Sequence, residues 1–413
     1  MERRDLTRAI MGVAAGSALL PRQTEAQTCT APCFAMTQAE ISAGISAAQI
    51  DTSIPPYRAD RYGFSNVATA SGATNAQSLA IAVKAATAAG ARLKIPGSVV
   101  QTAGALSIYG VPYPYSTSTV LELTCDVEGD GELGTVISCS GGPGSNFFAY
   151  FRLTGEKEIR DLWIKNGGAI ADSTIGLQLS SSAANGGPTQ PDGQMRVTRV
   201  LVSGFATNIQ LERTFTVTFD QVRATGGSYG VYCQPNVTAP SNTSPPFVTT
   251  HLHLNCDYES NAVNVFYQTS TTSTNITFVG GVSQNASNPY GANGSSYSNY
   301  FGNISNLHFI DWYCESQPAA IVIAAGGGTV TFDGLYLNGT GGIYLGSNAV
   351  GRFINVRTTS APGSTTDSLG GGDMTQIVTM EGCAWPAAST NFKSLVLIQS
   401  WINGTFTAFS STG

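Results

Sequence analysis

Short phrases of alternating apolar and polar residues recur along the second half of the chain. Six can be superimposed: VTFDQVRATGG (217–227), HLNCDYES (253–260), TFVGGVSQN (277–285), HFIDWYCES (308–316), TFDGLYLNG (331–339) and RFINVRTT (352–359). Their leading apolar residues are Phe219, Leu254, Phe278, Phe309, Phe332 and Phe353, at steps of 35, 24, 31, 23 and 21 residues. Units of this length bury their apolar faces only by stacking on one another. The pattern predicts a solenoid of parallel coils.

A helix is predicted ahead of the repeats. In AQSLAIAVKAATAA (76–89), Leu79, Ala82, Val83 and Ala86 form one apolar stripe, and Gly90 stands where a helix C-cap belongs. A strand follows at 91–97. An open solenoid end exposes core side chains and unpaired strand edges, so we expect this helix to cover that end.

The order YGF (62–64), polar turn, helix and LKIPG (93–97) resembles the N-terminal cap of the pectate-lyase superfamily, whose turn is usually rich in Gly and Asp; here it is SGATN (71–75), without an acid. The phrases at 257–260 and 313–316 also resemble coils of that superfamily, which includes polysaccharide lyases, glycoside hydrolases and phage tailspikes. The resemblance covers roughly 58–405. It implies an all-β, single-stranded right-handed parallel β-helix that engages a polysaccharide.

The N-terminal residues 1–26 are typical of an export signal. Arg3 and Arg4 precede the apolar run 9–20, and Thr24-Glu25-Ala26 offers a cleavage site, as in a twin-arginine signal for folded proteins. We therefore expect a signal (1–26), a linker (27–57) and one β-helix domain (58–413), in the periplasm or secreted. The formal net charge of −6 and the lack of a basic tract disfavour nucleic-acid binding, and no later stretch is long and apolar enough to span a membrane.

Eight cysteines in an exported chain permit disulfides. The closest spacings predict the pairs Cys29–Cys33 and Cys125–Cys139, whereas Cys233, Cys256 and Cys314 sit inside strand phrases as small buried hydrophobes. No spacing indicates a zinc site. We expect no resident metal or cofactor, with calcium left open, and the sequence does not indicate an oligomeric state.

An Asp or Asn follows the leading apolar residue of several coils, at Asp220, Asn255, Asp311, Asp333 and Asn355. Stacked coils lie about 4.8 Å apart, so equivalent side chains form files along the solenoid. Amide and carboxylate side chains at turns commonly bond the backbone, and we expect most of this set to be structural.

The coils at 251–260 and 307–316 carry more chemistry. They contain all three histidines, His251, His253 and His308, together with Asp257, Glu259, Asp311 and Glu315. His253 and His308 precede the leading residues Leu254 and Phe309, which predicts one shared file with a single coil between them, about 9 to 10 Å apart. Carboxyl groups roughly 6.5 to 9.5 Å apart suit an inverting glycosidase.

The four acids Asp257, Glu259, Asp311 and Glu315 are therefore the candidate catalytic residues. His253, His308, Arg223, Trp312 and Asp220 are the candidate substrate-binding residues. Each also has a plain structural interpretation, because acids at strand ends face solvent, histidines form surface hydrogen bonds and aromatic side chains fill cores.

Hydrolase and lyase chemistry both stay open. A lyase needs a cation for the uronate carboxylate and a base near C5, and Arg223 belongs to a cluster with Arg196, Arg199 and Arg213. The characteristic residue sets of polygalacturonases and of classical pectate lyases are missing. The alternatives are a non-catalytic glycan-binding or adhesin-like surface protein and a phage tailspike depolymerase, which the export signal disfavours.

Overall fold

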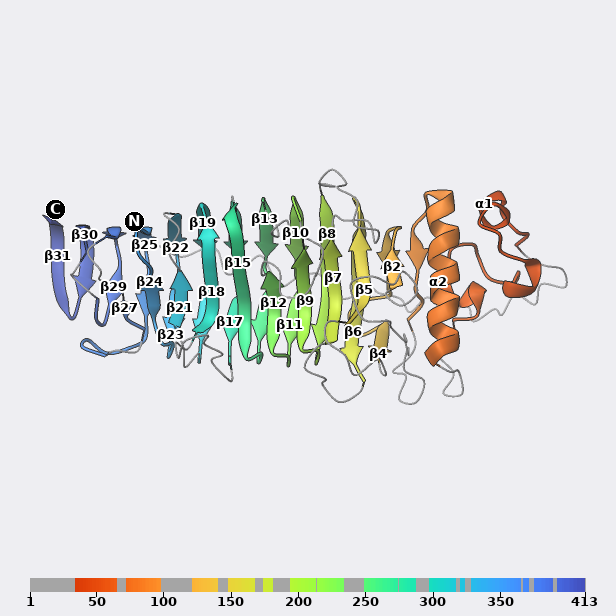
Figure 1. The fold of residues 1–413 in the computed structure, drawn as a ribbon. Helices are drawn as coiled ribbons and strands as arrows, with labels where there is room; N and C mark the ends of the chain where they lie inside the picture. The colour runs from red at the N-terminus through yellow and green to blue at the C-terminus, as the bar shows by residue number, and fades with distance from the viewer. Residues whose placement is uncertain are drawn as a thin grey trace, which may run out of the picture.

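The structure is a computed structural model that describes residues 34–64, 72–97, 121–139, 148–167, 174–180, 194–212, 214–233, 249–273, 275–286, 297–316, 320–323, 328–364, 367–370, 375–388 and 392–412. These residues form an elongated rod, with the helices at one end and strands stacked along its length (Figure 1). The export signal expected at 1–26 lies outside the described residues.

Within the described residues the strands form a 21-stranded sheet, sheet A, and a 10-stranded sheet, sheet B. Sheet A bends at a corner, and we call its strands before the corner the first leg and those after it the second leg. A typical coil runs through the first leg, the corner, the second leg and sheet B before it returns one coil further on. The pairings between coils are parallel, which confirms the predicted parallel β-helix.

The first leg comprises β1 (Leu93–Lys94), β3 (Val127–Glu128), β10 (Val217–Asp220), β13 (His251–Leu254), β16 (Ile276–Val279), β19 (Asn306–Ile310), β22 (Thr329–Asp333), β25 (Val350–Ile354) and β28 (Ile377–Glu381). The second leg comprises β4 (Val136–Cys139), β11 (Arg223–Thr225), β14 (Asp257–Glu259), β17 (Val282–Gln284), β20 (Tyr313–Glu315), β23 (Tyr336–Asn338), β26 (Arg357–Thr358) and β29 (Ala384–Trp385). Four strands pass through both legs, namely β6 (Glu158–Asn166), β8 (Met195–Ser203), β30 (Ser394–Ile402) and β31 (Thr405–Thr412).

Sheet B comprises β2 (Leu121–Leu123), β5 (Phe148–Thr154), β7 (Thr174–Ser180), β9 (Thr207–Glu212), β12 (Tyr229–Cys233), β15 (Val263–Ser273), β18 (Tyr297–Ile304), β21 (Ala320–Ile323), β24 (Ile343–Leu345) and β27 (Leu369–Gly370). Its inward residues pack against those of sheet A in one continuous core.

An aromatic file on the first leg holds the coils in register. Phe278, Phe309, Phe332 and Phe353 stack with ring centroids 4.9, 4.7 and 5.2 Å apart, in the predicted order. In the coil at 251–260, however, the file position belongs to His253 and not to Leu254, since His253 pairs with Phe219 and Phe278. The expected register was therefore wrong by one residue there, because a histidine occupies a position that elsewhere holds phenylalanine.

The N-terminal end of the solenoid is covered by α2 (Gly72–Ala89), as the helical pattern predicts, and Gly90 ends the helix with a φ of 61°. Before it come α1 (Gln38–Ser42) and the 3₁₀ helices η1 (Ala47–Gln49) and η2 (Ala59–Tyr62). The expected linker at 27–57 is packed structure from residue 34 onward. Fully buried Glu40 accepts hydrogen bonds from Arg61 Nε at 2.9 Å and from Tyr62 Oη at 2.7 Å.

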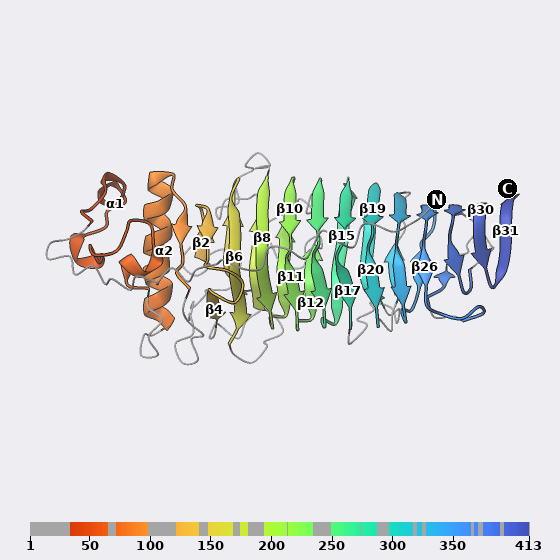
Figure 2. The same cartoon turned by 180° about the vertical axis from the view of Figure 1, so that it is seen from behind.

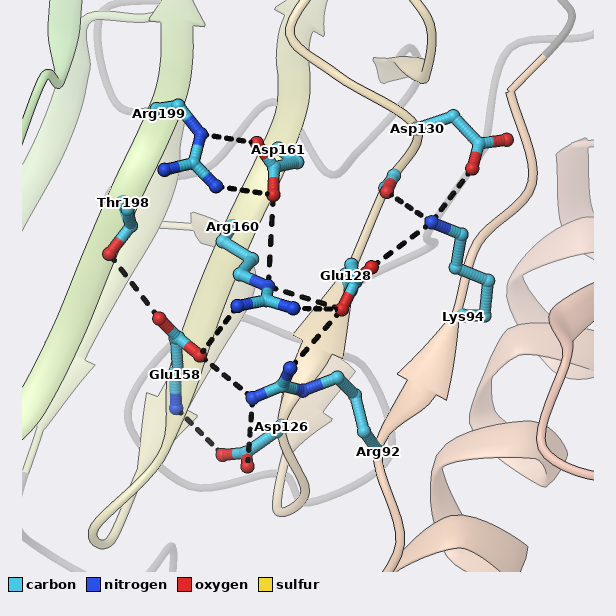
Figure 3. A network of polar contacts seen from close by, with 11 residues as sticks. Arg92, Lys94, Asp126, Glu128, Asp130, Glu158, Arg160, Asp161, Thr198 and Arg199 are labelled. Carbon is cyan, nitrogen blue, oxygen red and sulfur yellow. Dashed lines mark hydrogen bonds and ion pairs between the residues drawn. The ribbon is translucent and has the colours of Figure 1, made fainter.

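A network of charged side chains ties this end to the first coils (Figure 3). Glu128 accepts hydrogen bonds from Arg92 and Lys94, each at 3.2 Å, and also from Arg160. In the next coils, Arg199 on β8 donates a hydrogen bond from its Nε to Oδ1 of Asp161 on β6, at 2.6 Å. We call this set of residues, Arg92, Lys94, Asp126, Glu128, Asp130, Glu158, Arg160, Asp161 and Arg199, the N-terminal clamp.

The predicted disulfide between Cys125 and Cys139 is wrong, because both are free and buried. Burial raises the pKa of the Cys125 thiol to about 11, so it stays protonated. Cys233, Cys256 and Cys314 are also free and buried, as predicted. Cys29 and Cys33 lie outside the described residues. Among the described helices, none has the length and apolar character needed to cross a membrane.

Candidate active site on the second leg

The outward side chains of the second leg form two files. One contains Arg223, Asp257 and Val282, and continues through Tyr313 to Tyr336. The other contains Thr225, Glu259, Gln284, Glu315 and Asn338. Successive residues of a strand point to opposite faces, so Asp257 and Glu259 face outward while Tyr258 between them is fully buried. Three of the four candidate acids thus share this outward face.

Arg223 gathers three carboxylates. Its Nη2 donates to Glu259 Oε1 at 3.0 Å and its Nη1 to Glu132 Oε1 at 3.1 Å, while its Nε lies 3.4 Å from Asp257 Oδ2. Gln284 Nε2 donates to the other oxygen of Glu259 at 2.7 Å. We call Glu132, Arg223, Asp257, Glu259 and Gln284 the acid cluster. With three ionised carboxylates and one guanidinium, its formal charge is −2.

Asp257 is the unusual member of the acid cluster. Burial, and then the nearby charge of Glu259, raise the pKa of its carboxyl group above the ordinary value, although Arg223 acts in the opposite direction. Its Oδ1 atom is buried and has no hydrogen-bond partner among the described residues. A carboxyl group whose pKa is raised, next to other carboxylates, is the environment that general acids use.

Glu315 lies in the same file as Glu259, two coils away. With Gln284 between them, their backbones are about 9.6 Å apart. Glu315 Oε1 accepts a hydrogen bond from Asn338 Nδ2 at 3.1 Å, and Asn338 Nδ2 also lies 3.1 Å from the Tyr313 hydroxyl. Acid and amide side chains therefore alternate along this file, which separates the negative charges.

Aromatic side chains lie on both sides of the acids. Toward the C-terminus, the rings of Tyr313 and Tyr336 stack at 5.4 Å, and Tyr336 is exposed. Toward the N-terminus, Trp163 lies in the file of Arg223 two coils away, with its Nε1 donating to Ser203 Oγ at 2.8 Å and Lys165 Nζ 5.2 Å from its ring. Flat rings in line with carboxyl groups suit the faces of sugar rings.

Two of the predicted substrate-binding residues lie in the core instead. His253 is fully buried between the rings of Phe219 and Phe278, at 4.6 and 4.3 Å, and Trp312 is 2% exposed. Neither can touch a polysaccharide on the outside of the solenoid. Moving a strand by one residue exchanges its two faces, which is why the register error placed His253 outside.

The remaining candidates lie away from the acid cluster. His308 is exposed on the first leg, in the file of Thr277 and Thr331 and not in that of His253. Asp220 ends a first-leg strand, where it pairs with Leu254.

Asp311 occupies the corner with a φ of 50°. An added Cβ on corner residue Gly334 would lie 2.3 Å from its Oδ1, so the Asp311 side chain covers the glycine of the next coil. This is a structural role, as expected for most of the Asp and Asn set.

Sequence reasoning missed Glu132 and Gln284. Glu132 is 91 residues from Arg223 and sits in the turn DGELG (130–134), so no repeat pattern links the two. Gln284 could have been found, because the superimposed phrases put it between Glu259 and Glu315. Among the described residues, no group of three or more His, Cys, Asp or Glu side chains is placed to hold a metal ion.

No protein-family model and no curated protein matches the chain. Solved structures do resemble it. The enzymatically active domain of tailspike protein 2 from bacteriophage CBA120 aligns with a TM-score of 0.55 at 13% identity, over 85% of this chain and 52% of that one. The full-length tailspike protein 2, from an Escherichia coli O157:H7 bacteriophage, aligns with a TM-score of 0.51 at 14% identity, over 85% and 46%.

The A-module of the mannuronan C-5 epimerase AlgE4 from Azotobacter vinelandii aligns more weakly, with a TM-score of 0.45 at 15% identity, over 84% of this chain and 95% of that one. The chain spans about half the length of the tailspike structures it matches. At these identities the likeness shows the fold. The protein is a right-handed parallel β-helix, the fold that the sequence resemblance implied.

Proposed function

We propose that the protein is a polysaccharide hydrolase that binds its substrate along the outward face of the second leg. The observation that carries the proposal is the environment of the Asp257 carboxyl group. Burial and the charge of Glu259 raise its pKa, and Asp257 and Glu259 contact the same guanidinium, that of Arg223. The CBA120 domain with the same fold is described as enzymatically active. Because one fold hosts many functions, that likeness supports the proposal only as an analogy.

In the proposed mechanism, Asp257 donates its proton to the glycosidic oxygen as the bond to the leaving sugar breaks. Glu259, held by Arg223 and Gln284, takes a proton from the attacking water. This arrangement of one acid and one base that activates water corresponds to inversion at the anomeric carbon. Tyr313, Tyr336 and Trp163 provide stacking surfaces for flanking sugars.

The charge of the acid cluster favours hydrolysis over elimination. A lyase needs a free cation to neutralise the substrate uronate. Arg223 already contacts three carboxyl groups, and the cluster stays negative, with a formal charge of −1, even when Asp257 carries the proton that it donates, so it repels a polyuronate. A neutral polysaccharide is therefore the proposed substrate class, and the proposed enzyme needs no cofactor. Unchanged activity after treatment with a calcium chelator would support the cofactor-free proposal.

The test is incubation with a panel of neutral polysaccharides and polyuronates, followed by reducing-end and ultraviolet assays. We expect new reducing ends from a neutral polymer without an unsaturated product, and a loss of about 10²-fold or more in Asp257→Asn. Asp311→Asn is the matched control and should retain activity. Ultraviolet-absorbing products from a polyuronate would instead establish a lyase.

A non-catalytic glycan-binding protein is the second candidate, favoured by the stacked pair Tyr313 and Tyr336. It predicts that Glu259→Gln and Glu315→Gln keep glycan binding, and that replacing both tyrosines by alanine abolishes binding. Binding without cleavage of any polymer on the panel would favour this candidate over the hydrolase.

We also propose that residues 1–26 direct folded export to the periplasm or beyond. The paired Arg3 and Arg4 and the apolar run at 9–20 support this proposal. Mass spectrometry of the protein from the exported fraction should show a chain that starts near Gln27. Retention in the cytoplasm with an intact N-terminus would refute it.

A further inference from the structure

The two ends of the solenoid are built differently. The N-terminal end is covered by α2 and held by the N-terminal clamp, whereas at the other end β31 (Thr405–Thr412) is the last strand (Figures 1 and 2). β31 pairs antiparallel with β30 on both sides of the corner, with Gln399 and Ala408 outside the pairing, and within the described residues it pairs with no other strand. Its outer edge thus presents unpaired backbone N–H and C=O groups over eight residues that turn the corner.

This edge lacks the features that normally prevent strand pairing. Charged side chains, prolines and bulges are the usual protections of an edge strand. From Ser394 to Gly413 the sequence contains no Asp, Glu, Lys, Arg, His or Pro. Large apolar side chains are exposed beside it instead: Trp401 is 50% exposed, Phe406 49% and Phe409 70%. The rings of Trp401 and Phe406 lie 5.0 Å apart across the two strands.

We propose that β31 is the interface between two copies of this chain, paired antiparallel edge to edge. Two identical strands that pair antiparallel are related by a two-fold axis. The backbone N–H and C=O groups of each strand then form hydrogen bonds with those of the other, so one surface is complementary to itself. The absence of charge from 394 to 412 favours a second copy over a different partner, because no charge is present to select one. The net charge of −6 lies entirely in the remainder of the chain, so two copies repel each other least where their β31 strands meet.

Sedimentation velocity of the full chain over a range of micromolar concentrations tests the proposal. We expect a species of twice the monomer mass that dissociates on dilution. Ala408→Lys combined with Phe409→Lys should give a monomer at every concentration, because both side chains are exposed on β31. Tyr344→Lys is the matched control, since Tyr344 is also 50% exposed but lies on sheet B, and it should leave the dimer intact.

Cross-linking keeps the test decisive if the lysine variant folds poorly. In a symmetric antiparallel pair centred on Ala408, Ala408 meets its own copy, whereas Thr405 meets Ser411 of the other chain. Ala408→Cys should therefore form a disulfide-linked dimer on mild oxidation, beyond any formed by the unsubstituted chain, and Thr405→Cys should not. A monomeric wild-type chain, a dimer that persists in the lysine variant, or equal cross-linking of the two cysteine variants would overturn the proposal.

Discussion

The environment of Asp257 links function to stability at the scale of a single residue. Since folding raises the pKa of this carboxyl group, the folded protein binds its proton more tightly than the unfolded chain does. The stabilising contribution is complete below the unfolded pKa and is lost as the pH rises through the folded pKa. At neutral pH, which is above the unfolded pKa, the raised pKa of Asp257 therefore costs stability, as is common for catalytic groups.

Asp257→Asn should raise the free energy of unfolding at pH 7 by on the order of 1 kcal/mol while it abolishes cleavage, because it removes a buried charge with an unpaired oxygen. At pH 2.5, well below the ordinary Asp value of 3.8, the wild-type carboxyl is protonated in both states and the gain should disappear. Thermal melts of both proteins at the two pH values measure the difference. A loss of stability at pH 7 would show that the contact with Arg223 outweighs the burial.

The buried histidines make a second residue-scale contribution. His253 Nδ1 lies 2.6 Å from the Tyr258 hydroxyl and its Nε2 lies 3.0 Å from the Tyr267 hydroxyl, which also lies 3.1 Å from His251 Nδ1. Burial lowers the pKa of His251 to about 3 and lowers that of His253 well below its usual value. Both are neutral in the folded protein, so stability is lost as the pH falls below the unfolded value of about 6.5.

His253→Phe should extend the phenylalanine file but leave two buried hydroxyl groups without this partner. We expect it to destabilise the protein at pH 7 by about 1 to 3 kcal/mol. It should also reduce the stability lost between pH 6.5 and 4, because one buried neutral histidine is gone. Urea unfolding at these pH values gives both quantities, and an unchanged pH dependence would argue against a buried neutral His253.

At the scale of the elements, the corner of sheet A depends on residues with a left-handed backbone. Gly334 has a φ of 74°, and an added Cβ would lie 2.3 Å from Asp311 Oδ1. Gly339 has a φ of 67° with nothing within 4 Å of such a Cβ. An alanine at either position would have the same left-handed backbone strain. Only at Gly334 would its Cβ also clash with Asp311.

Gly334→Ala should therefore cost more stability than Gly339→Ala, which we expect to cost about 1 kcal/mol from the backbone conformation alone. The excess in Gly334→Ala, about 1 to 3 kcal/mol, should shrink when Asp311→Ala is added. Thermal melts of the three variants test this directly. Equal costs for the two glycine variants would mean that Asp311 moves aside freely and does not cover the corner.

The elements also show how far the sequence could lead. Repeated phenylalanines specify a file that only a solenoid satisfies, and the apolar stripe at 76–89 specifies the helix, so both follow from the sequence. The pattern failed at His253, because a polar residue took an interior position that Tyr258 and Tyr267 satisfy with hydrogen bonds from other segments. Glu132 could not be predicted either, since its place beside Arg223 depends on how a distant turn folds over the second leg.

At the scale of the whole molecule, a solenoid is stabilised by contacts between neighbouring coils, so its ends open more readily than its middle. Here the ends are unequal. The N-terminal end has the helix and the clamp, in which Glu128 alone accepts hydrogen bonds from Arg92, Lys94 and Arg160 (Figure 3). At the C-terminal end, none of the described strands pairs with the outer edge of β31. Opening should therefore begin at β31 in the monomer.

Hydrogen exchange followed by mass spectrometry should show fast exchange in β30 and β31 at low protein concentration, and slower exchange there as the proposed dimer forms. Glu128→Gln should instead accelerate exchange around β1 and β3, because removing one carboxylate leaves three basic side chains without a shared partner. High salt should act in the same direction on the wild-type clamp, because its members are partly exposed to solvent. Faster exchange at the N-terminal end than at β31 in the wild-type monomer would contradict this prediction. It would mean that the helix and the clamp protect their end of the solenoid less than the C-terminal strands protect theirs.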